Sequence, residues 1–160
     1  MVKLELKYKI LRVSDTEEFK KMAYALYEED SDMYGITEEK LKATIQESVL
    51  NKEHLKIILL WLGDEIIGYC IVVTYWSNRL GGNLIHIDEI YLKPEFRNKG
   101  YAQQAIKAAE KIHGSENWCL GTILQEKGNC HFYEKLGYHR IGKIDNISDI
   151  MDIVYYEKDS

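Results

Sequence analysis

The sequence contains few of the residues that mark several common classes of protein. Only one proline occurs in 160 residues, at position 94, and no Gly/Ser/Pro-rich linker divides the chain. We therefore predict a single domain over residues 1–160, which is long enough to bury a core of its own. Hydrophobic residues make up 46% of the chain and charged residues 29%, a balance typical of folded globular proteins.

Cysteines, long apolar runs and surplus positive charge are also scarce. The three cysteines are odd in number and none forms a CxxC pair, so we expect neither a disulfide framework nor a cysteine zinc site, and no metal. The longest apolar stretch, residues 66–76, is too short to span a bilayer. The net charge of −5 argues against a nucleic-acid partner. We expect a soluble, cytoplasmic protein without a membrane partner.

Hydrophobic periodicity and turn signals predict eleven elements in the order β-α-α-β-β-β-α-β-α-β-β. Helices are predicted to begin after caps at Ser14, Thr37 and Asn129 and after Gly100. The predicted strands cover residues 6–13, 55–62, 66–76, 84–92, 118–124, 138–144 and 151–158. Such a mixture indicates an α/β (α+β) layer fold in which helices flank a central, mostly antiparallel mixed sheet.

The segment of residues 87–102, IDEIYLKPEFRNKGYA, carries the strongest functional signal. A predicted strand runs through a short loop directly into a helix, whose first backbone N–H groups have no partner inside the helix. Together with the helix dipole, these groups form an anion site, which Arg97 and Lys99 supplement with positive charge. Gly100 lets a phosphate approach the backbone. No Walker motif or GxGxxG is present, so a different kind of phosphate ligand is indicated.

Two motifs resemble one known family. Arg97-x-x-Gly100-x-Ala102 resembles the pyrophosphate-binding signature of the GNAT acetyltransferase superfamily, and residues 132–138, FYEKLGY, resemble that family's second cofactor motif. The element order also matches the family, so the resemblance covers nearly the whole chain. The Asp88-Glu89 pair is similar to a Glu-Asp pair of the polyamine (diamine) acetyltransferase branch.

The resemblance implies an acetyl-CoA-dependent N-acetyltransferase, with acetyl-CoA as co-substrate. In that family a splayed strand pairs with the pantetheine arm, the loop N–H groups hold the pyrophosphate, and a helix tyrosine points at the sulfur. Many relatives place an asparagine seven residues before that tyrosine, where this chain has Glu126, so Asn129 is either a cofactor contact or a helix cap. The implied cofactor-binding residues are Ile90, Tyr91, Leu92, Arg97, Asn98, Lys99, Gly100, Tyr101, Ala102, Asn129 and Tyr133.

The reaction requires a base, because only a neutral amine attacks a thioester. An alkylamine with a pKa near 10.4 is neutral in roughly one molecule of a few thousand at pH 7, a shortfall of about 4–5 kcal/mol. Asp88, Glu89 and His86 are the candidate proton acceptors, in that order, and the sequence leaves the choice open. Tyr133 is the candidate donor of a hydrogen bond, or a proton, to the leaving thiolate. The predicted catalytic residues are therefore Tyr133, Asp88 and Glu89.

The acceptor is less well specified by the sequence. Residues 28–34 contain four carboxylates, which attract cations, and Tyr75, Trp76 and Tyr91 offer aromatic faces to an ammonium group. We expect a small cationic amine such as a polyamine, an aminoglycoside or an amino-acid derivative. A protein lysine or N-terminus, or a non-catalytic acyl-CoA-binding module, stays open as an alternative. Pairing of the C-terminal strands at a sheet edge would give a homodimer.

Overall fold

The structure is a computed structural model that describes residues 3–29, 35–113, 118–123, 127–148 and 151–158. The order of helices and strands is the predicted one. The elements are β1 (Leu6–Ile10), the 3₁₀ helix η1 (Val13–Asp15), α1 (Thr16–Glu29), α2 (Glu38–Leu50), β2 (Leu55–Leu62), β3 (Glu65–Ser77), β4 (Gly82–Leu92), the 3₁₀ helix η2 (Pro94–Phe96), α3 (Tyr101–His113), β5 (Trp118–Ile123), α4 (Lys127–Lys135), β6 (His139–Ser148) and β7 (Met151–Lys158).

The strands form a seven-stranded sheet in the order β1-β2-β3-β4-β5-β7-β6. Strands β4 and β5 pair in parallel, whereas the pairs β1–β2, β2–β3, β5–β7 and β6–β7 are antiparallel. This confirms the predicted α/β fold with a mixed, mostly antiparallel sheet. Contacts divide the chain into two compact units, Met1–Val73 with Glu89–Ile106 and Thr74–Asp88 with Lys107–Ser160, which are described in turn.

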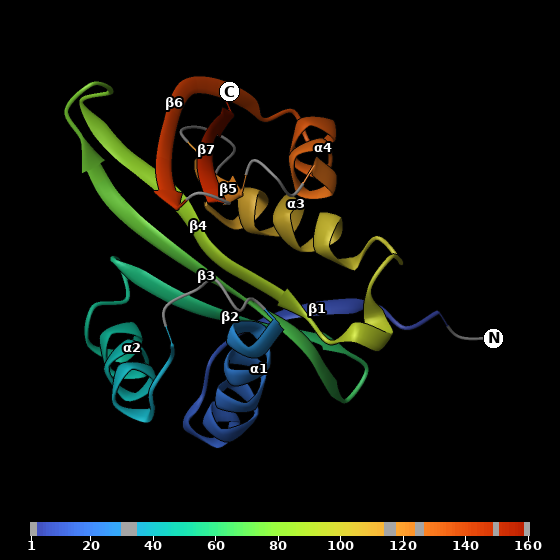
Figure 1. Ribbon diagram of the computed structural model, residues 1–160. Helices are drawn as coiled ribbons and strands as arrows, with labels where there is room; N and C mark the ends of the chain where they lie inside the picture. The colour runs from blue at the N-terminus through green and yellow to red at the C-terminus, as the bar shows by residue number, and fades with distance from the viewer. Residues whose placement is uncertain (1–2, 30–34, 114–117, 124–126, 149–150, 159–160) are drawn as a thin grey trace. The chain divides into compact units, whose positions relative to one another are not determined.

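In the first unit, α1 and α2 cover one face of β2 and β3 (Figure 1). Phe19 of α1 meets the edge of the Tyr69 ring at 4.9 Å, and both side chains are almost completely buried. The other face carries a second cluster that contains Leu92 and Ala105. Because Tyr91 belongs to the first cluster and Leu92 to the second, both faces of the end of β4 are packed against a core. Each large side chain buried in this way contributes about 1.5–3 kcal/mol.

The entries to the first two helices show one success and one error of the sequence prediction. The Thr37 cap is confirmed, since its hydroxyl accepts a hydrogen bond from the Lys40 N–H at 3.2 Å. The Ser14 cap was wrong, because Ser14 lies inside η1, and the buried Asp15 carboxylate instead accepts from the Arg12 N–H at 3.3 Å. Asp15 also accepts from the Arg12 guanidinium, so an ion pair supports this helix entry.

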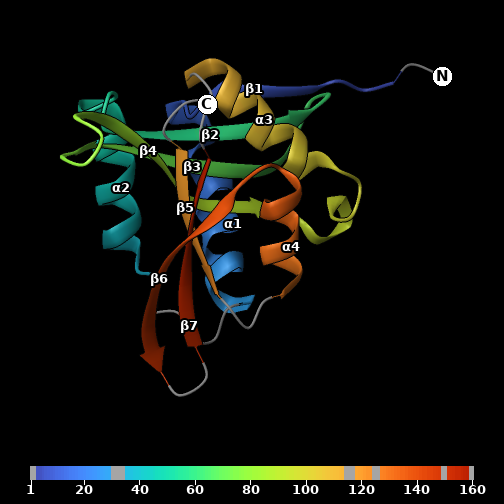
Figure 2. The ribbon, with the colours of Figure 1, turned by 90° about the horizontal axis from the view of Figure 1, so that it is seen from above.

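In the second unit, β5 lies between β4 and β7, and β6 and β7 form a long hairpin (Figure 2). The carboxylate of Glu110 on α3 is buried, where it accepts from the Tyr138 hydroxyl at 3.0 Å and from the Lys158 ammonium at 2.9 Å. These contacts fasten α3 to the residue before β6 and to the end of β7. The register of the hairpin shifts between Arg140 and Ile144, and an irregular edge of this kind disfavours uncontrolled pairing. A homodimer through these strands stays a prediction.

Several predicted boundaries move. The first strand ends at Ile10 rather than at residue 13, the predicted 77–83 loop is shortened by longer strands on both sides, and the sixth strand spans His139–Ser148. Of the apolar stretch 66–76, the residues from Ile66 to Val72 are buried, but Tyr75 and Trp76 are exposed. Gly114, predicted to end a helix, and Leu124, at the end of the predicted fifth strand, lie outside the described residues.

Asn129 does not cap a helix. Helix α4 begins two residues earlier, at Lys127, so Asn129 lies in its first turn and is exposed. The residues before Phe132 are mostly polar and show no hydrophobic periodicity, so the start of this helix could not be predicted from them. Within the described residues, no helix is long and apolar enough to cross a membrane.

Gly68 fixes how closely the end of β4 can approach β3. A Cβ atom at this position would lie 2.2 Å from the Tyr91 carbonyl oxygen, a distance that real Cβ atoms essentially never show. The neighbouring Ile67 carbonyl accepts a hydrogen bond from the Lys93 N–H at 2.9 Å, at the point where β4 leads into the loop. The strand that leads into the candidate site is therefore positioned by backbone contact.

We predict that Gly68→Ala destabilises the protein by about 2–3 kcal/mol, because the added methyl group must displace backbone rather than a flexible side chain. Urea unfolding of the variant measures this loss. Gly82→Ala is the matched control, since nothing lies within 4 Å of its Cβ position, and it should change stability by less than about 0.5 kcal/mol. Equal stabilities of the two variants would contradict the proposed close approach.

Candidate active site

The loop before α3 takes an unusual backbone path. After β4 the chain closes a 3₁₀ turn in which the Phe96 N–H donates to the Lys93 carbonyl at 2.9 Å. Asn98 and Gly100 then adopt left-handed conformations with φ of 62° and 82°. Asparagine and glycine are the residues that tolerate this region best. Left-handed residues just before a helix turn successive N–H groups toward a common point, an arrangement that suits an anion.

The start of α3 has N–H groups to offer. The N–H of Gln104, the fourth residue of the helix, donates to the Gly100 carbonyl at 3.1 Å and closes the first helical turn. The N–H groups of the three residues before it have no partner within a helix of this geometry. Nothing lies within 4 Å of the Cβ position of Gly100, so the approach to these groups is open. The predicted loop therefore has the geometry of an anion site at the positive end of the helix dipole.

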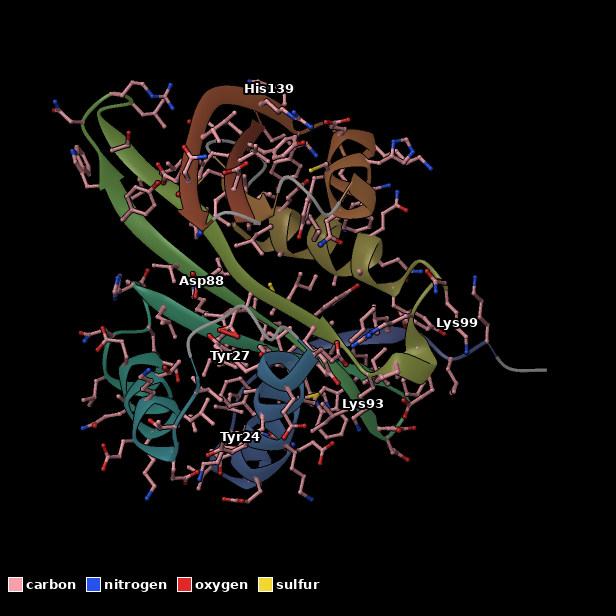
Figure 3. The ribbon with its side chains drawn as sticks, viewed as in Figure 1. Tyr24, Tyr27, Asp88, Lys93, Lys99 and His139 are labelled. Atoms are coloured by element: carbon pink, nitrogen blue, oxygen red, sulfur yellow. The ribbon has the colours of Figure 1, made fainter. Side chains whose placement is uncertain are left out.

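The two cations of the motif are placed differently. Lys99 is exposed and extends from the loop, with its amine 5.9 Å from the centre of the Phe96 ring (Figure 3). The Arg97 guanidinium instead donates through Nε to the Leu92 carbonyl at 2.9 Å and through Nη2 to both oxygens of Glu29, at 2.8 and 2.9 Å. The structure thus shows Arg97 in an ion pair with the end of α1.

Glu89 lies half-buried on the face of β4 that α1 covers. Its carboxylate accepts hydrogen bonds from the Tyr69 hydroxyl at 3.0 Å and from the Tyr27 hydroxyl at 3.4 Å. Burial, reinforced by the negative charge of Glu89, raises the pKa of Tyr69, so this phenol remains a proton donor. Tyr27 is on the α1 helix, as Figure 3 shows. Two tyrosines from separate elements therefore fix the orientation of this carboxylate.

In the second unit, His86 and Asp88 belong to a different group of side chains. His86 Nδ1 lies 3.2 Å from the Cys119 sulfur, to which the Tyr75 hydroxyl also approaches at 3.6 Å, and His86 Nε2 lies 3.9 Å from Asp88 Oδ1. Burial lowers the pKa of His86, against the opposing effect of Asp88, and burial raises the pKa of the Cys119 thiol. Both shifts keep the pair neutral near pH 7. The Asp88 side chain is 54% exposed.

Tyr133 is buried on α4 within an aromatic cluster of the second unit. Its ring centre lies 5.2 Å from that of Phe132, 6.2 Å from that of Tyr138 and 6.5 Å from that of Tyr156. The first two contacts have edge-to-face geometry, which is favourable for aromatic pairs. The ring of the predicted thiolate partner is therefore held in one place by its neighbours.

The structure adds partners that the sequence analysis missed. Tyr27 and Tyr69 gave no signal because they lie 62 and 20 residues from Glu89 in the chain. Cys119 joins His86 only through the pairing of two parallel strands, in which these two residues are opposite each other. Their contact becomes visible only when the strand register is known.

The aromatic and acidic features predicted for the acceptor are only partly present. Tyr91 is buried, and the Arg97 guanidinium lies over its ring at 5.4 Å, so this ring is not available to an ammonium ion. Tyr75 and Trp76 are exposed. Of the acidic run, Glu28 and Glu29 end α1, and residues 30–34, like Glu126, lie outside the described residues. Among the described side chains, no three His, Cys, Asp or Glu residues are grouped to hold a metal.

Comparison with protein families decides the assignment. The profile of the acetyltransferase (GNAT) family matches residues 21–138, which include both sequence motifs. The chain belongs to the GNAT acetyltransferase family. It is thus an acyltransferase of the family whose members use acetyl-CoA, as the motifs predicted. No significant match is found among curated proteins.

Several solved structures share the fold at low sequence identity. A "possible acetyltransferase" from Clostridium difficile 630 superposes with a TM-score of 0.75 at 17% identity, covering 91% of this chain and 97% of its own. Spermidine N-acetyltransferase from Vibrio cholerae, solved with CoA and spermine, gives 0.73 at 13% identity, with 95% and 94% covered. The NatC complex, bound to Gag peptide and CoA, gives 0.71 at 15% identity, with 98% and 99% covered. Identities this low establish the fold and leave the acceptor open.

We predict that His86 makes the protein less stable in acid. The pKa of an unfolded histidine is about 6.5. Because the folded pKa of His86 is lower, the unfolded state binds more protons below pH 6.5, and the free energy of unfolding falls as pH falls through that value. His86→Gln should have a shallower decline between pH 7.5 and pH 5, measured by urea unfolding at each pH. An unchanged slope would show that His86 does not contribute.

Proposed function

We propose that this GNAT acetyltransferase transfers the acetyl group of acetyl-CoA to a primary amine of a small cationic acceptor, with Glu89 as the proton acceptor. The observation that carries the proposal is the Glu89 carboxylate, which two tyrosine hydroxyls hold half-buried on the strand that leads into the anion-binding loop. A carboxylate oriented in this way matches what amine acetylation requires of a base.

For the donor, we propose that the N–H groups from Asn98 to Ala102 bind the CoA pyrophosphate. The left-handed Asn98 and Gly100, the helix start and the open space at Gly100 support this assignment. The exposed Lys99 adds a cation to the same loop. Pairing of the backbone of Ile90, Tyr91 and Leu92 with the pantetheine arm, and a cofactor contact by Asn129, stay predictions carried by the family resemblance.

The structure favours Glu89 over the other two candidate bases. Asp88, ranked first from the sequence, is more than half exposed, and the His86 ring lies 3.9 Å from its carboxylate. The His86 ring is shared with the Cys119 sulfur. Glu89 alone combines partial burial with two fixed hydrogen-bond donors. A proton acceptor held in place in this way avoids reorganisation during the reaction.

In the proposed step, Glu89 first accepts a proton from the ammonium group of the acceptor. The neutral nitrogen then attacks the thioester carbonyl carbon, the C–S bond breaks, and the second proton lost by the nitrogen passes to water. The sulfur leaves as a thiolate. Full proton transfer from a phenol of pKa near 10 to a thiolate of pKa near 8.5 is uphill by about 2 kcal/mol. We therefore assign Tyr133 a hydrogen bond that strengthens as the thiolate forms, and its packing in the aromatic cluster supports this role.

The acceptor class rests on charge. The chain carries a net charge of −5, and Glu28 lies near the end of the helix that also supplies Tyr27. A negative region around a site raises the encounter rate of a cation. The similar spermidine N-acetyltransferase was solved with spermine, which agrees with a small polyamine, whereas the similar NatC complex was solved with a peptide. A protein amine is accordingly the second candidate, and both belong in one acceptor panel.

The donor site predicts a charge-dependent loss of CoA binding. We expect acetyl-CoA to raise the melting temperature of the wild type, because ligand at 100 times Kd adds about 2.7 kcal/mol to the free energy of unfolding. The melting temperature of Gly100→Glu should not change. A carboxylate beside the phosphates would repel them. Gly100→Gln is the matched control, because it has the same size and the same backbone strain at φ 82° but no charge, so it should keep part of the shift.

The wild type decides the cofactor claim: no shift in its melting temperature at millimolar acetyl-CoA would contradict acetyl-CoA binding. If Gly100→Glu and Gly100→Gln lose the acetyl-CoA-induced rise in melting temperature equally, the size of the side chain and not its charge causes the loss. That result would remove the support for a phosphate at this position.

The base assignment predicts different effects of two neighbouring carboxylates. Glu89→Gln should lower kcat about 10²- to 10⁴-fold with the best acceptor of an amine panel, because the amide cannot accept the proton. Asp88→Asn should stay within about threefold of the wild type. Steady-state kinetics, with acetyl-CoA affinity measured separately, checks both variants. The reverse order would return the base role to Asp88. Failure of every amine in the panel despite CoA binding would favour a binding module.

A further inference from the structure

We propose that Arg97 is a positioning residue, which latches the anion-binding loop to the end of α1 through Glu29 and does not bind the phosphates through its side chain. This inference rests on the proposed CoA site, and it assigns Glu29 a function in cofactor binding that the sequence motif does not contain. The motif arginine would otherwise be read as a cationic ligand of the pyrophosphate.

The guanidinium is held on three sides. Nε donates to the Leu92 carbonyl at 2.9 Å, which fastens the loop to the last residue of β4. Nη2 donates to both carboxylate oxygens of Glu29 at 2.8 and 2.9 Å, and the planar group lies 5.4 Å from the centre of the Tyr91 ring. An arginine that makes a charge-assisted pair, a backbone bond and a stacking contact at once has one preferred position.

The ion pair also weakens the case for a phosphate ligand. Glu29 neutralises the charge of Arg97, so the pair as a whole offers a phosphate little net attraction. If Arg97 were to bind the pyrophosphate instead, Glu29 would compete for the same Nη2 group. The carboxylate would also repel the anion. A direct ligand role therefore predicts that removing the charge of Glu29 strengthens CoA binding, whereas the latch predicts the opposite.

The Arg97–Glu29 latch stabilises a loop whose backbone conformation is strained. Asn98, directly after Arg97, has φ of 62°, a conformation that a non-glycine residue adopts at some cost in free energy. Arg97 itself is extended, with φ −76° and ψ 158°, and caps η2. Fixing its side chain to β4 and α1 holds the residue that precedes the strained one. The N–H groups are then oriented before the ligand arrives, which reduces the entropy lost on binding.

The experiment measures CoA affinity by isothermal titration calorimetry in the wild type and four variants. Arg97→Gln and Glu29→Gln should each weaken CoA binding roughly 3- to 10-fold, the range for a partly exposed pair that also orients a loop. Arg97→Lys should weaken binding as well, because an ammonium keeps the charge but cannot make the forked contacts. Glu28→Gln is the matched control: it removes the same charge one residue away and should leave CoA affinity unchanged.

Hydrogen–deuterium exchange without any ligand separates the latch from the proposed function. Amides of residues 97–104 should exchange faster in Arg97→Gln and Glu29→Gln than in the wild type and Glu28→Gln, at equal global stability. Stronger or unchanged CoA binding in Glu29→Gln, or unchanged exchange in that segment, would overturn the latch. If the wild type fails to bind CoA, the proposed function fails, and the exchange data still decide whether Arg97 positions the loop.

Discussion

The proposed function depends on the backbone N–H groups at the start of α3. A helix leaves its first N–H groups without internal partners, and a buried helix end would be unfavourable without a ligand or a cap. Here the start of the helix follows a loop with two left-handed residues and an open space at Gly100. Gly68 lets the end of β4 approach its neighbour closely, and Arg97 ties the loop to Glu29. In this account, both features orient one anion site.

The same strand that leads into the loop carries the proposed base. Glu89 and Tyr91 lie on the face of β4 toward α1, where Tyr69 contacts both of them: its hydroxyl bonds to Glu89, and its ring lies 5.9 Å from the Tyr91 ring. Alternation along a strand places Leu92 on the opposite face, in the second core cluster. One short segment thus orients a carboxylate and starts the anion-binding loop. In the proposed mechanism, this segment therefore serves both the acceptor and CoA.

Much of this arrangement was predictable from the sequence, because it depends on local signals. The strand at residues 55–62, the Thr37 cap and the strand–loop–helix at Arg97-x-x-Gly100-x-Ala102 each follow from neighbouring residues. Two errors were local: Asp15 rather than Ser14 supports a helix entry by pairing with Arg12 three residues before it, and α4 starts before Asn129. The other differences depend on distant partners. Arg97 pairs with Glu29, 68 residues away, and His86 meets Cys119 only across a strand pair. Charge, spacing and periodicity contain no information on these distant contacts.

The most direct test of the central claim follows the backbone N–H groups themselves. Titration of ¹⁵N-labelled protein with CoA, monitored by two-dimensional NMR, should shift the amide resonances of residues 98–103 most strongly, with one common Kd. Pantetheine, which is the thiol arm of CoA without the pyrophosphate, should leave these resonances in place. Strong shifts elsewhere in the chain with none in residues 98–103 would contradict the assignment of the start of α3 as the pyrophosphate site.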